Sequence, residues 1–249
     1  MSAPAFRLDG RHILITGASR GIGAAIAVAF ASAGAAKLTL IARDRQALHA
    51  IAGSARAEGA EVDPVSCDVT DTSAFGAALA GLDPLDVLVC AAGANVPQPI
   101  SELDLATADV LWALNVRAGL QAVRDVVSHM PAGGAVVFIS SQMGHVGAPE
   151  RSVYCATKHA VEGMTRALAV ELAPRGLRVV AIAPTFVATA MTAGWLADET
   201  VRNEWLARIP LGRLATVEEV AAAALFAASP AAGSLTGTSL VVDGGWTAR

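Results

Sequence analysis

Cysteine is scarce in this sequence, and its spacing fits neither metal binding nor disulfide pairing. The 249 residues include three cysteines, at positions 67, 90 and 155. Their number is odd, and none of the intervals matches the short spacing of zinc ligands. Because disulfides persist mainly in oxidising compartments, we expect three reduced thiols, a cytoplasmic protein and no metal site. Small buried core residues are the simplest role for these thiols.

Charge is low, and long apolar runs are missing. Asp, Glu, Lys and Arg together form 16% of the chain, and the formal net charge is −4. A protein that binds nucleic acid normally carries a basic excess, so we do not expect that partner. No run approaches the roughly 18 apolar residues of a membrane-spanning helix. Residues 1–10 lack the basic start and apolar core of a signal peptide, so we expect no membrane partner either.

The sequence does contain a regular alternation of two kinds of segment. Short segments rich in Val, Ile and Leu are apolar at nearly every position, which is typical of strands buried on both faces. They cover residues 12–16, 38–42, 61–66, 87–90, 135–140, 178–183 and 239–242. Longer Ala-rich segments with helical spacing lie between them, over residues 22–32, 45–57, 74–80, 106–129, 153–173 and 217–228.

This order of strands and helices predicts an α/β fold. The chain should form a Rossmann-type, doubly wound parallel β-sheet of about seven strands, flanked by helices on both faces. No linker rich in Pro, Gly or Ser interrupts the series, so we expect one domain over residues 1–249. Residues 185–210 break the rhythm and carry aromatic side chains among polar ones. They are either a substrate lid or a packed helical excursion without mobility.

A glycine-rich turn follows the first predicted strand. Residues 16–23 read TGASRGIG and open the first predicted helix. Gly17, Gly21 and Gly23 allow a tight turn and the close approach of a pyrophosphate, which the free N–H groups of the helix would bind. Three glycines alone are a weak signal, and a connection without a ligand is the alternative. The position between a strand and a helix favours a dinucleotide site.

The end of the second predicted strand bears on the choice between NAD and NADP. Many NAD-binding folds place a carboxylate there to bind the ribose 2′-hydroxyl. Here Ala42 occupies that place and Arg43 follows. Together with Arg20 of the glycine turn, Arg43 can bind a 2′-phosphate through charge-assisted, forked hydrogen bonds. We therefore expect NADP(H), and NAD(H) stays possible if Asp44 turns toward the ribose instead of capping a helix.

Tyr154 and Lys158 lie four residues apart on a predicted helix and so share one face. Tyr154 is the only tyrosine of the chain. A nearby ammonium should lower the pKa of the phenol and make it an effective proton donor and acceptor. The pair alone also fits an ordinary amphipathic helix. Two further residues support chemistry: Ser141 at the end of the fifth predicted strand, and Asn115 in the helix before it.

These motifs together resemble those of the short-chain dehydrogenase/reductase family, over residues 7–246. The glycine turn matches its Thr-Gly-x-x-x-Gly-x-Gly motif, and Tyr154 and Lys158 match its Tyr-x-x-x-Lys motif. Ser141 and Asn115 match the other two members of its catalytic tetrad. The resemblance implies hydride transfer between NADP(H) and a carbonyl or secondary-alcohol substrate.

The resemblance also implies a role for each residue. Tyr154 would be the general acid/base, and Ser141 would bind the substrate oxygen. Lys158 would hold the ribose hydroxyls, and Asn115 would hold a water of a proton relay. The cofactor residues implied are Gly17, Ser19, Arg20, Gly21, Ile22, Gly23, Arg43, Asp68, Val69, Ala92, Gly93, Tyr154, Lys158, Pro184, Val187 and Thr189.

Two positions depart from the family pattern. Cys90-Ala91-Ala92-Gly93 replaces Asn-Asn-Ala-Gly, which removes an asparagine that ties neighbouring strands. Pro184-Thr185 replaces Pro-Gly beside the nicotinamide, which reduces backbone freedom there. We expect altered stability and loop geometry from these changes, and no effect on the tetrad.

The substrate is the least determined part of the prediction. Polar side chains at the expected mouth of the site favour a polyol, sugar or sugar acid, with a 3-oxoacyl thioester or a small ketone as alternatives. A dinucleotide sensor without catalysis and an epimerase or dehydratase are readings from other classes. The family resemblance implies a homo-oligomer, commonly a tetramer. The substrate contacts that we predict are Asn95, Gln142, Met143, His145, Arg151, Phe186, Met191 and Trp195.

Overall fold

The computed structural model describes residues 6–189, 192, 194 and 198–248. Two predicted substrate contacts, Met191 and Trp195, lie outside the described residues. None of the helices within these ranges combines the length and the apolar character that crossing a membrane requires.

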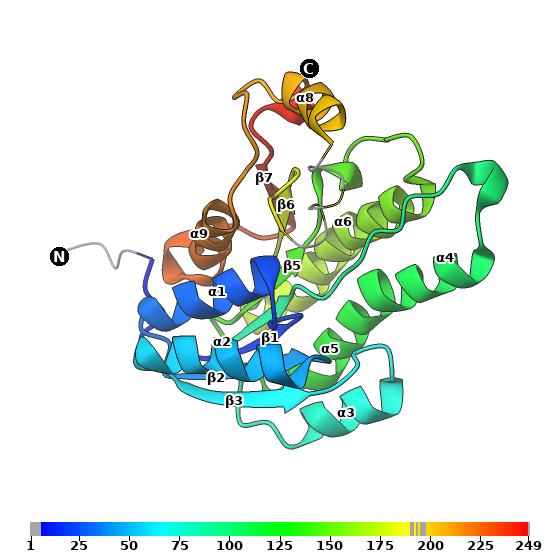
Figure 1. The fold of residues 1–249 in the computed structure, drawn as a ribbon. Helices are drawn as coiled ribbons and strands as arrows, with labels where there is room; N and C mark the ends of the chain where they lie inside the picture. Colours follow the sequence, from blue (N-terminus) through cyan, green and yellow to red (C-terminus); the bar gives the residue numbers. More distant parts are fainter. Residues whose placement is uncertain (1–5, 190–191, 193, 195–197, 249) are drawn as a thin grey trace.

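A seven-stranded parallel sheet forms the centre of the fold, in the order β3-β2-β1-β4-β5-β6-β7 (Figure 1). The strand order reverses between β1 and β4, which is the switch point where such sheets bind ligands. The predicted doubly wound Rossmann-type sheet is therefore confirmed. The strands are β1 His12–Thr16, β2 Lys37–Ala42, β3 Glu61–Ser66, β4 Val87–Cys90, β5 Ala135–Ile139, β6 Arg178–Pro184 and β7 Thr238–Val242.

Helices cover both faces of this sheet (Figure 1). One face carries α1 Gly21–Ser32, α2 Arg45–Ala57 and α9 Val217–Ala228, which pack on one core cluster that includes Phe30. The other face carries α3 Thr72–Ala80, α5 Ala118–Val126 and α6 Ser152–Leu172, which pack on a second cluster that includes Phe75 and Phe138. Because the central strands are buried on both faces, their sequences are apolar at nearly every position.

The single helix predicted over residues 106–129 is wrong in one respect. The chain forms α4 Leu105–Trp112, a π-helical turn Ala113–Arg117, then α5 and a short 3-10 turn Val127–His129. The Ala118 amide donates to the Ala113 carbonyl, five residues back. Such a turn inserts one extra residue without ending the helical path, so apolar periodicity does not reveal it. Asn115 lies within this turn, and its position on the helix is set by it.

An aromatic cluster joins the segment after β6 to the end of the chain. Trp205 of α8 (Glu199–Ala207) stacks on Trp246 with ring centroids 5.5 Å apart. Phe186 packs against both rings, at 4.4 Å from Trp205 and 5.9 Å from Trp246. In Figure 1, α8 and the C-terminal end accordingly lie together at the top of the molecule. The described part of residues 185–210 is thus packed on its own chain.

Candidate active site

A cavity of about 500 Å³ lies at the carboxyl edge of the sheet. Its walls come from the segments that follow six of the strands, β1 to β6, which is where open α/β sheets bind ligands. Most of the predicted residues line it: Gly17, Ser19, Arg20, Ile22, Gly23, Arg43, Asp68, Val69, Ala92, Gly93, Asn95, Ser141, Gln142, Met143, Tyr154, Lys158, Pro184, Phe186, Val187 and Thr189.

Four predicted residues within the described ranges do not line the cavity: Gly21, Asn115, His145 and Arg151. Arg151 starts α6 with a buried side chain, and its guanidinium lies 3.9 Å from the Glu150 carboxylate. His145 faces away toward Glu162, at 3.4 Å. Neither side chain lines the cavity, and their contact with a substrate stays a prediction.

The glycine turn needs its glycines for packing as well as for conformation. Gly17 has φ +70°, and a Cβ there would lie 2.7 Å from the Ala92 Cα after β4. Gly23 lies in the first turn of α1, and a Cβ there would lie 2.3 Å from the Gly17 carbonyl oxygen. Arg20 precedes α1 and gives it no side-chain cap, so the first N–H groups of the helix are available to an anion. The turn thus fits the pyrophosphate of a dinucleotide.

The charges beside β2 distinguish the two possible cofactors. Asp44 caps α2, and its carboxylate accepts from the Ala47 amide at 3.0 Å. The Arg43 side chain is 70% exposed, and its guanidinium lies 3.7 Å from the Asp68 carboxylate. Hydrogen bonds from Thr70 and the charge of Arg43 hold the pKa of Asp68 below its usual range. Since the Asp44 carboxylate is engaged in the cap, the largely exposed Arg43 guanidinium is the group at this corner that suits a 2′-phosphate.

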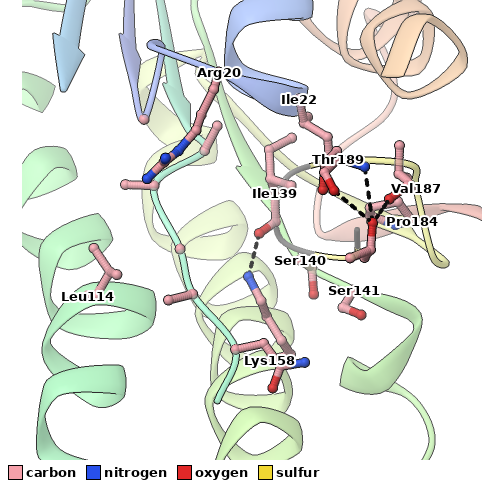
Figure 2. A pocket seen from close by; sticks show the side chains of 18 of the residues that line it. Arg20, Ile22, Leu114, Ile139, Ser140, Ser141, Lys158, Pro184, Val187 and Thr189 are labelled. Carbon is pink, nitrogen blue, oxygen red and sulfur yellow. Dashed lines mark hydrogen bonds between the residues drawn. The ribbon is translucent and has the colours of Figure 1, made fainter. Parts of the chain in front are cut away.

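Tyr154 and Ser141 face each other across the cavity. Their hydroxyls are hydrogen-bonded, and Ser141 Oγ also accepts from the Met143 amide at 3.1 Å. Lys158 lies below them with its Nζ 5.6 Å from the centroid of the Tyr154 ring. Figure 2 shows the Lys158 ammonium reaching the Ile139 carbonyl, a hydrogen bond of 2.9 Å, to one side of Ser140 and Ser141. The end of β5 therefore fixes the lysine head group.

The predicted effect of Lys158 on Tyr154 is wrong for this structure. Burial raises the pKa of Tyr154 to about 12, and the hydrogen bond to Ser141 offsets only part of this rise. Burial also lowers the pKa of Lys158 to about 8, against the opposing charge of Glu162. Removal from water disfavours both the phenolate and the ammonium. Tyr154 is thus a protonated group at neutral pH, which suits the donation of a proton.

Asn115 acts on the cavity wall from behind. Its Oδ1 accepts from the Ala94 amide at 2.9 Å, and its Nδ2 donates to the Ala94 carbonyl at 2.9 Å. Nδ2 also donates to Thr157 Oγ1 at 3.1 Å, next to Lys158 on α6. The side chain thus ties the loop after β4 to the helix that carries Tyr154 and Lys158. Its role in a water relay stays a prediction.

Several lining residues were not predicted. Some contribute backbone or small apolar side chains, which leave little trace in a sequence. Two of them could have been predicted from the sequence. Ser140 is adjacent to the predicted catalytic Ser141, and Thr185 departs from the family pattern. The residues not predicted are Ala42, Asp44, Cys67, Ala91, Ala94, Leu114, Ile139, Ser140, Thr185 and Thr192. In the part of the chain that the structure describes, no three His, Cys, Asp or Glu side chains gather as metal ligands would.

Comparison with known proteins agrees with this geometry. A family profile described as enoyl-(acyl carrier protein) reductase matches residues 17–247. The galactitol 2-dehydrogenase (L-tagatose-forming) of Cereibacter sphaeroides is 43% identical over 97% of both chains. The L-xylulose reductase of Bos taurus is 38% identical over 97% of this chain and 98% of its own.

A solved structure shares the fold over almost the whole chain. It is a gluconate 5-dehydrogenase from Burkholderia cenocepacia in complex with NADP and tartrate, with a TM-score of 0.92. Its sequence is 31% identical, and the match covers 98% of each chain. With the profile match and the extent of these similarities, the chain belongs to the short-chain dehydrogenase/reductase family and is an oxidoreductase of the alcohol–carbonyl pair.

Proposed function

We propose that this enzyme transfers a hydride between NADP(H) and a polyol, a sugar or a sugar acid. The observation that carries the substrate class is the polar character of the cavity lining, to which Asn95, Ser140, Gln142 and Thr185 contribute. Among the residues that the structure describes, these atoms have no hydrogen-bond partner in the protein: Asn95 Oδ1, Ser140 Oγ, Gln142 Oε1, Gln142 Nε2 and Thr185 Oγ1.

Buried polar atoms are almost always hydrogen-bonded, because an unmet group costs about 1–3 kcal/mol. Gln142 is 1% exposed, and neither the oxygen nor the nitrogen of its amide has a hydrogen-bond partner. A substrate with several hydroxyls offers donors and acceptors together, as each of these side chains requires. An acyl chain offers neither, so the 3-oxoacyl thioester is the weaker alternative, although the matching profile carries an acyl-carrier description.

Each of the proposed catalytic residues has its own role in the reaction. The nicotinamide supplies or accepts the hydride when the cofactor is bound. Tyr154 gives a proton to the carbonyl oxygen during reduction and takes it back during oxidation. Ser141 donates a hydrogen bond to the same oxygen and stabilises its developing charge. Lys158 binds the ribose hydroxyls, and Asn115 connects this lysine to solvent through water.

The surroundings of the cavity support two further parts of the proposal. Phe186 and Thr192, from residues 185–210, line the cavity, which supports a role for this segment on the substrate side. The chain assembles with copies of itself, as the family resemblance implies, and its three free cysteines favour the cytoplasm. Large apolar side chains are exposed on α4 and α5, namely Leu105, Val110, Trp112 and Leu120. Exposed apolar groups of this kind mark contact surfaces.

Replacing Arg43 by Ala tests the cofactor. The Kd for NADPH should rise by about ten-fold or more, or about 1.4 kcal/mol, while the Kd for NADH changes by less than about two-fold. The reason is that only NADPH carries the 2′-phosphate that Arg43 faces. Titration of both cofactors by fluorescence measures this difference, with Arg45→Ala, at the first residue of α2, as the matched control. Equal losses for both cofactors would show that Arg43 does not bind the phosphate.

Replacing Gln142 by Leu tests the substrate class. The kcat/KM for a polyol or sugar should fall by about ten- to a hundred-fold, because a hydroxyl of the substrate loses its partner. Reduction of a small ketone without hydroxyls should change by less than about three-fold. Gln121→Leu makes the same exchange at a buried position outside the cavity and serves as control. A parallel loss on both substrates would assign Gln142 a structural role and argue against the polyol reading.

A further inference from the structure

A second cluster of polar side chains lies behind the cavity, around Glu162 of α6. Glu162 is 2% exposed. Its Oε2 accepts a hydrogen bond from the Ser239 hydroxyl of β7. Its Oε1 lies 3.4 Å from His145 Nε2, and the His145 side chain is 31% exposed. A buried carboxylate is costly unless charges or hydrogen bonds compensate it, so this arrangement calls for an explanation.

The cluster touches the backbone of the proposed active site at Gly144. This residue ends a 3-10 turn, Gln142–Gly144, which Ser141 caps with its hydroxyl. A Cβ at Gly144 would lie 3.0 Å from each of three atoms, Glu162 Cγ, the Lys158 carbonyl oxygen and Ser140 Oγ. The turn that follows Ser141 therefore rests directly on Glu162 and on the backbone of Lys158. The contact of His145 with Glu162 holds the far end of this segment.

Glu162 also acts on Lys158 through its charge. The two residues are four apart on α6 and so lie on the same face, one turn from each other. Burial lowers the pKa of Lys158, and the charge of Glu162 opposes this. In the part of the chain that the structure describes, three titratable groups lie around Lys158. Tyr154 and Glu162 come from α6, and His145 contacts Glu162 from the segment after β5. Glu162 is the acid among them that favours the ammonium.

We propose that Glu162 is a positioning residue, which keeps Lys158 charged in the cavity and fixes the turn after Ser141 against α6. The inference deepens the proposed function and rests on it, because Lys158 serves there as the cation that binds the nicotinamide ribose. His145 closes the cluster on the solvent side and Ser239 on the sheet side. One buried carboxylate thereby aligns the lysine with the serine, although it touches neither substrate nor cofactor.

The test is the pH dependence of NADPH binding by Glu162→Gln, which keeps the shape of the side chain and removes its charge. In the parent protein, log Kd should bend upward near pH 8, where Lys158 loses its proton. In the variant the bend should move down by about one pH unit or more. NADPH should then bind about five-fold more weakly at pH 8, and equally well at pH 6. Fluorescence titration from pH 6 to 9 measures both.

Three companion variants separate charge from packing. Glu162→Met removes the charge with an apolar side chain of similar length and should shift the bend as Gln does, which also covers a failure of the Gln variant to fold. Glu162→Asp keeps the charge and should stay near the parent curve. Glu171→Gln removes an exposed charge from the same helix and should change nothing. A curve for Glu162→Gln or Glu162→Met that coincides with the parent, or an equal shift in Glu162→Asp, would overturn the proposal.

This measurement needs no substrate, so it separates the inference from the proposed function. If no polyol, sugar or sugar acid is turned over but the bend moves as expected, the proposed substrate class fails and the role of Glu162 stands. If a substrate is turned over but the bend does not move, the role of Glu162 fails alone.

Discussion

Replacing Tyr154 by Phe should lower kcat by about a thousand-fold or more and leave the Kd for NADPH within about three-fold of the parent. The variant loses one hydroxyl and keeps the ring. That hydroxyl is the proposed proton donor, and it is hydrogen-bonded to Ser141. Since burial raises the pKa of Tyr154 to about 12, the parent holds the proton at neutral pH and has it ready for reduction. Single-turnover oxidation of NADPH by a sugar or ketone measures the loss.

The control for this variant is a measurement of its stability and of its NADPH binding. Tyr154 is the only tyrosine, so Phe at this position removes every phenol from the chain. The unfolding midpoint and the NADPH titration should both resemble those of the parent, because the packing of the ring against Met143, Cys155 and Phe186 persists. Turnover within about ten-fold of the parent, with intact binding, would mean that another group supplies the proton.

The sequence was sufficient to predict the sheet because most of its strands are apolar at nearly every position. The predicted segments agree with β1 to β7 to within one residue at each end. The pattern is strongest in β1, β4 and β5, which are buried on both faces. The helix over residues 106–129 failed for the opposite reason. A π-helical turn changes the hydrogen bonding at Asn115 and hardly changes the apolar pattern, so it became visible only in three dimensions.

The site divides in the same way into local and non-local features. The glycine turn and the pair Tyr154 and Lys158 are set by spacing along one segment, and the structure places them on one cavity. His145 and Arg151 come from the loop before α6, and their directions depend on Glu162 and Glu150. The sign of the pKa shift of Tyr154 depends on burial, which no local motif reports.

Replacing Gly23 by Ala should weaken NADPH binding by about a hundred-fold or more, or about 2.7 kcal/mol. Alanine is ordinarily the better residue in a helix, by about 1 kcal/mol. Here its methyl group would lie 2.3 Å from the Gly17 carbonyl oxygen and 2.9 Å from the Gly17 carbonyl carbon. Both atoms belong to the backbone, so the turn must move away from α1. Gly17 has little room to move, because it is packed against Ala91 and Ala92 after β4.

The strain should therefore appear in stability as well as in binding, with a loss of about 2 kcal/mol or more in the free energy of unfolding. Gly53→Ala is the matched control, since Gly53 lies in α2 and a Cβ there would meet nothing within 4 Å. That variant should be as stable as the parent, or up to about 1 kcal/mol more stable, with unchanged affinity for NADPH. Denaturant unfolding and fluorescence titration of the two variants side by side give the comparison. If Gly23→Ala binds NADPH as the parent does, the turn does not hold the pyrophosphate, and the cofactor must enter the cavity by other contacts.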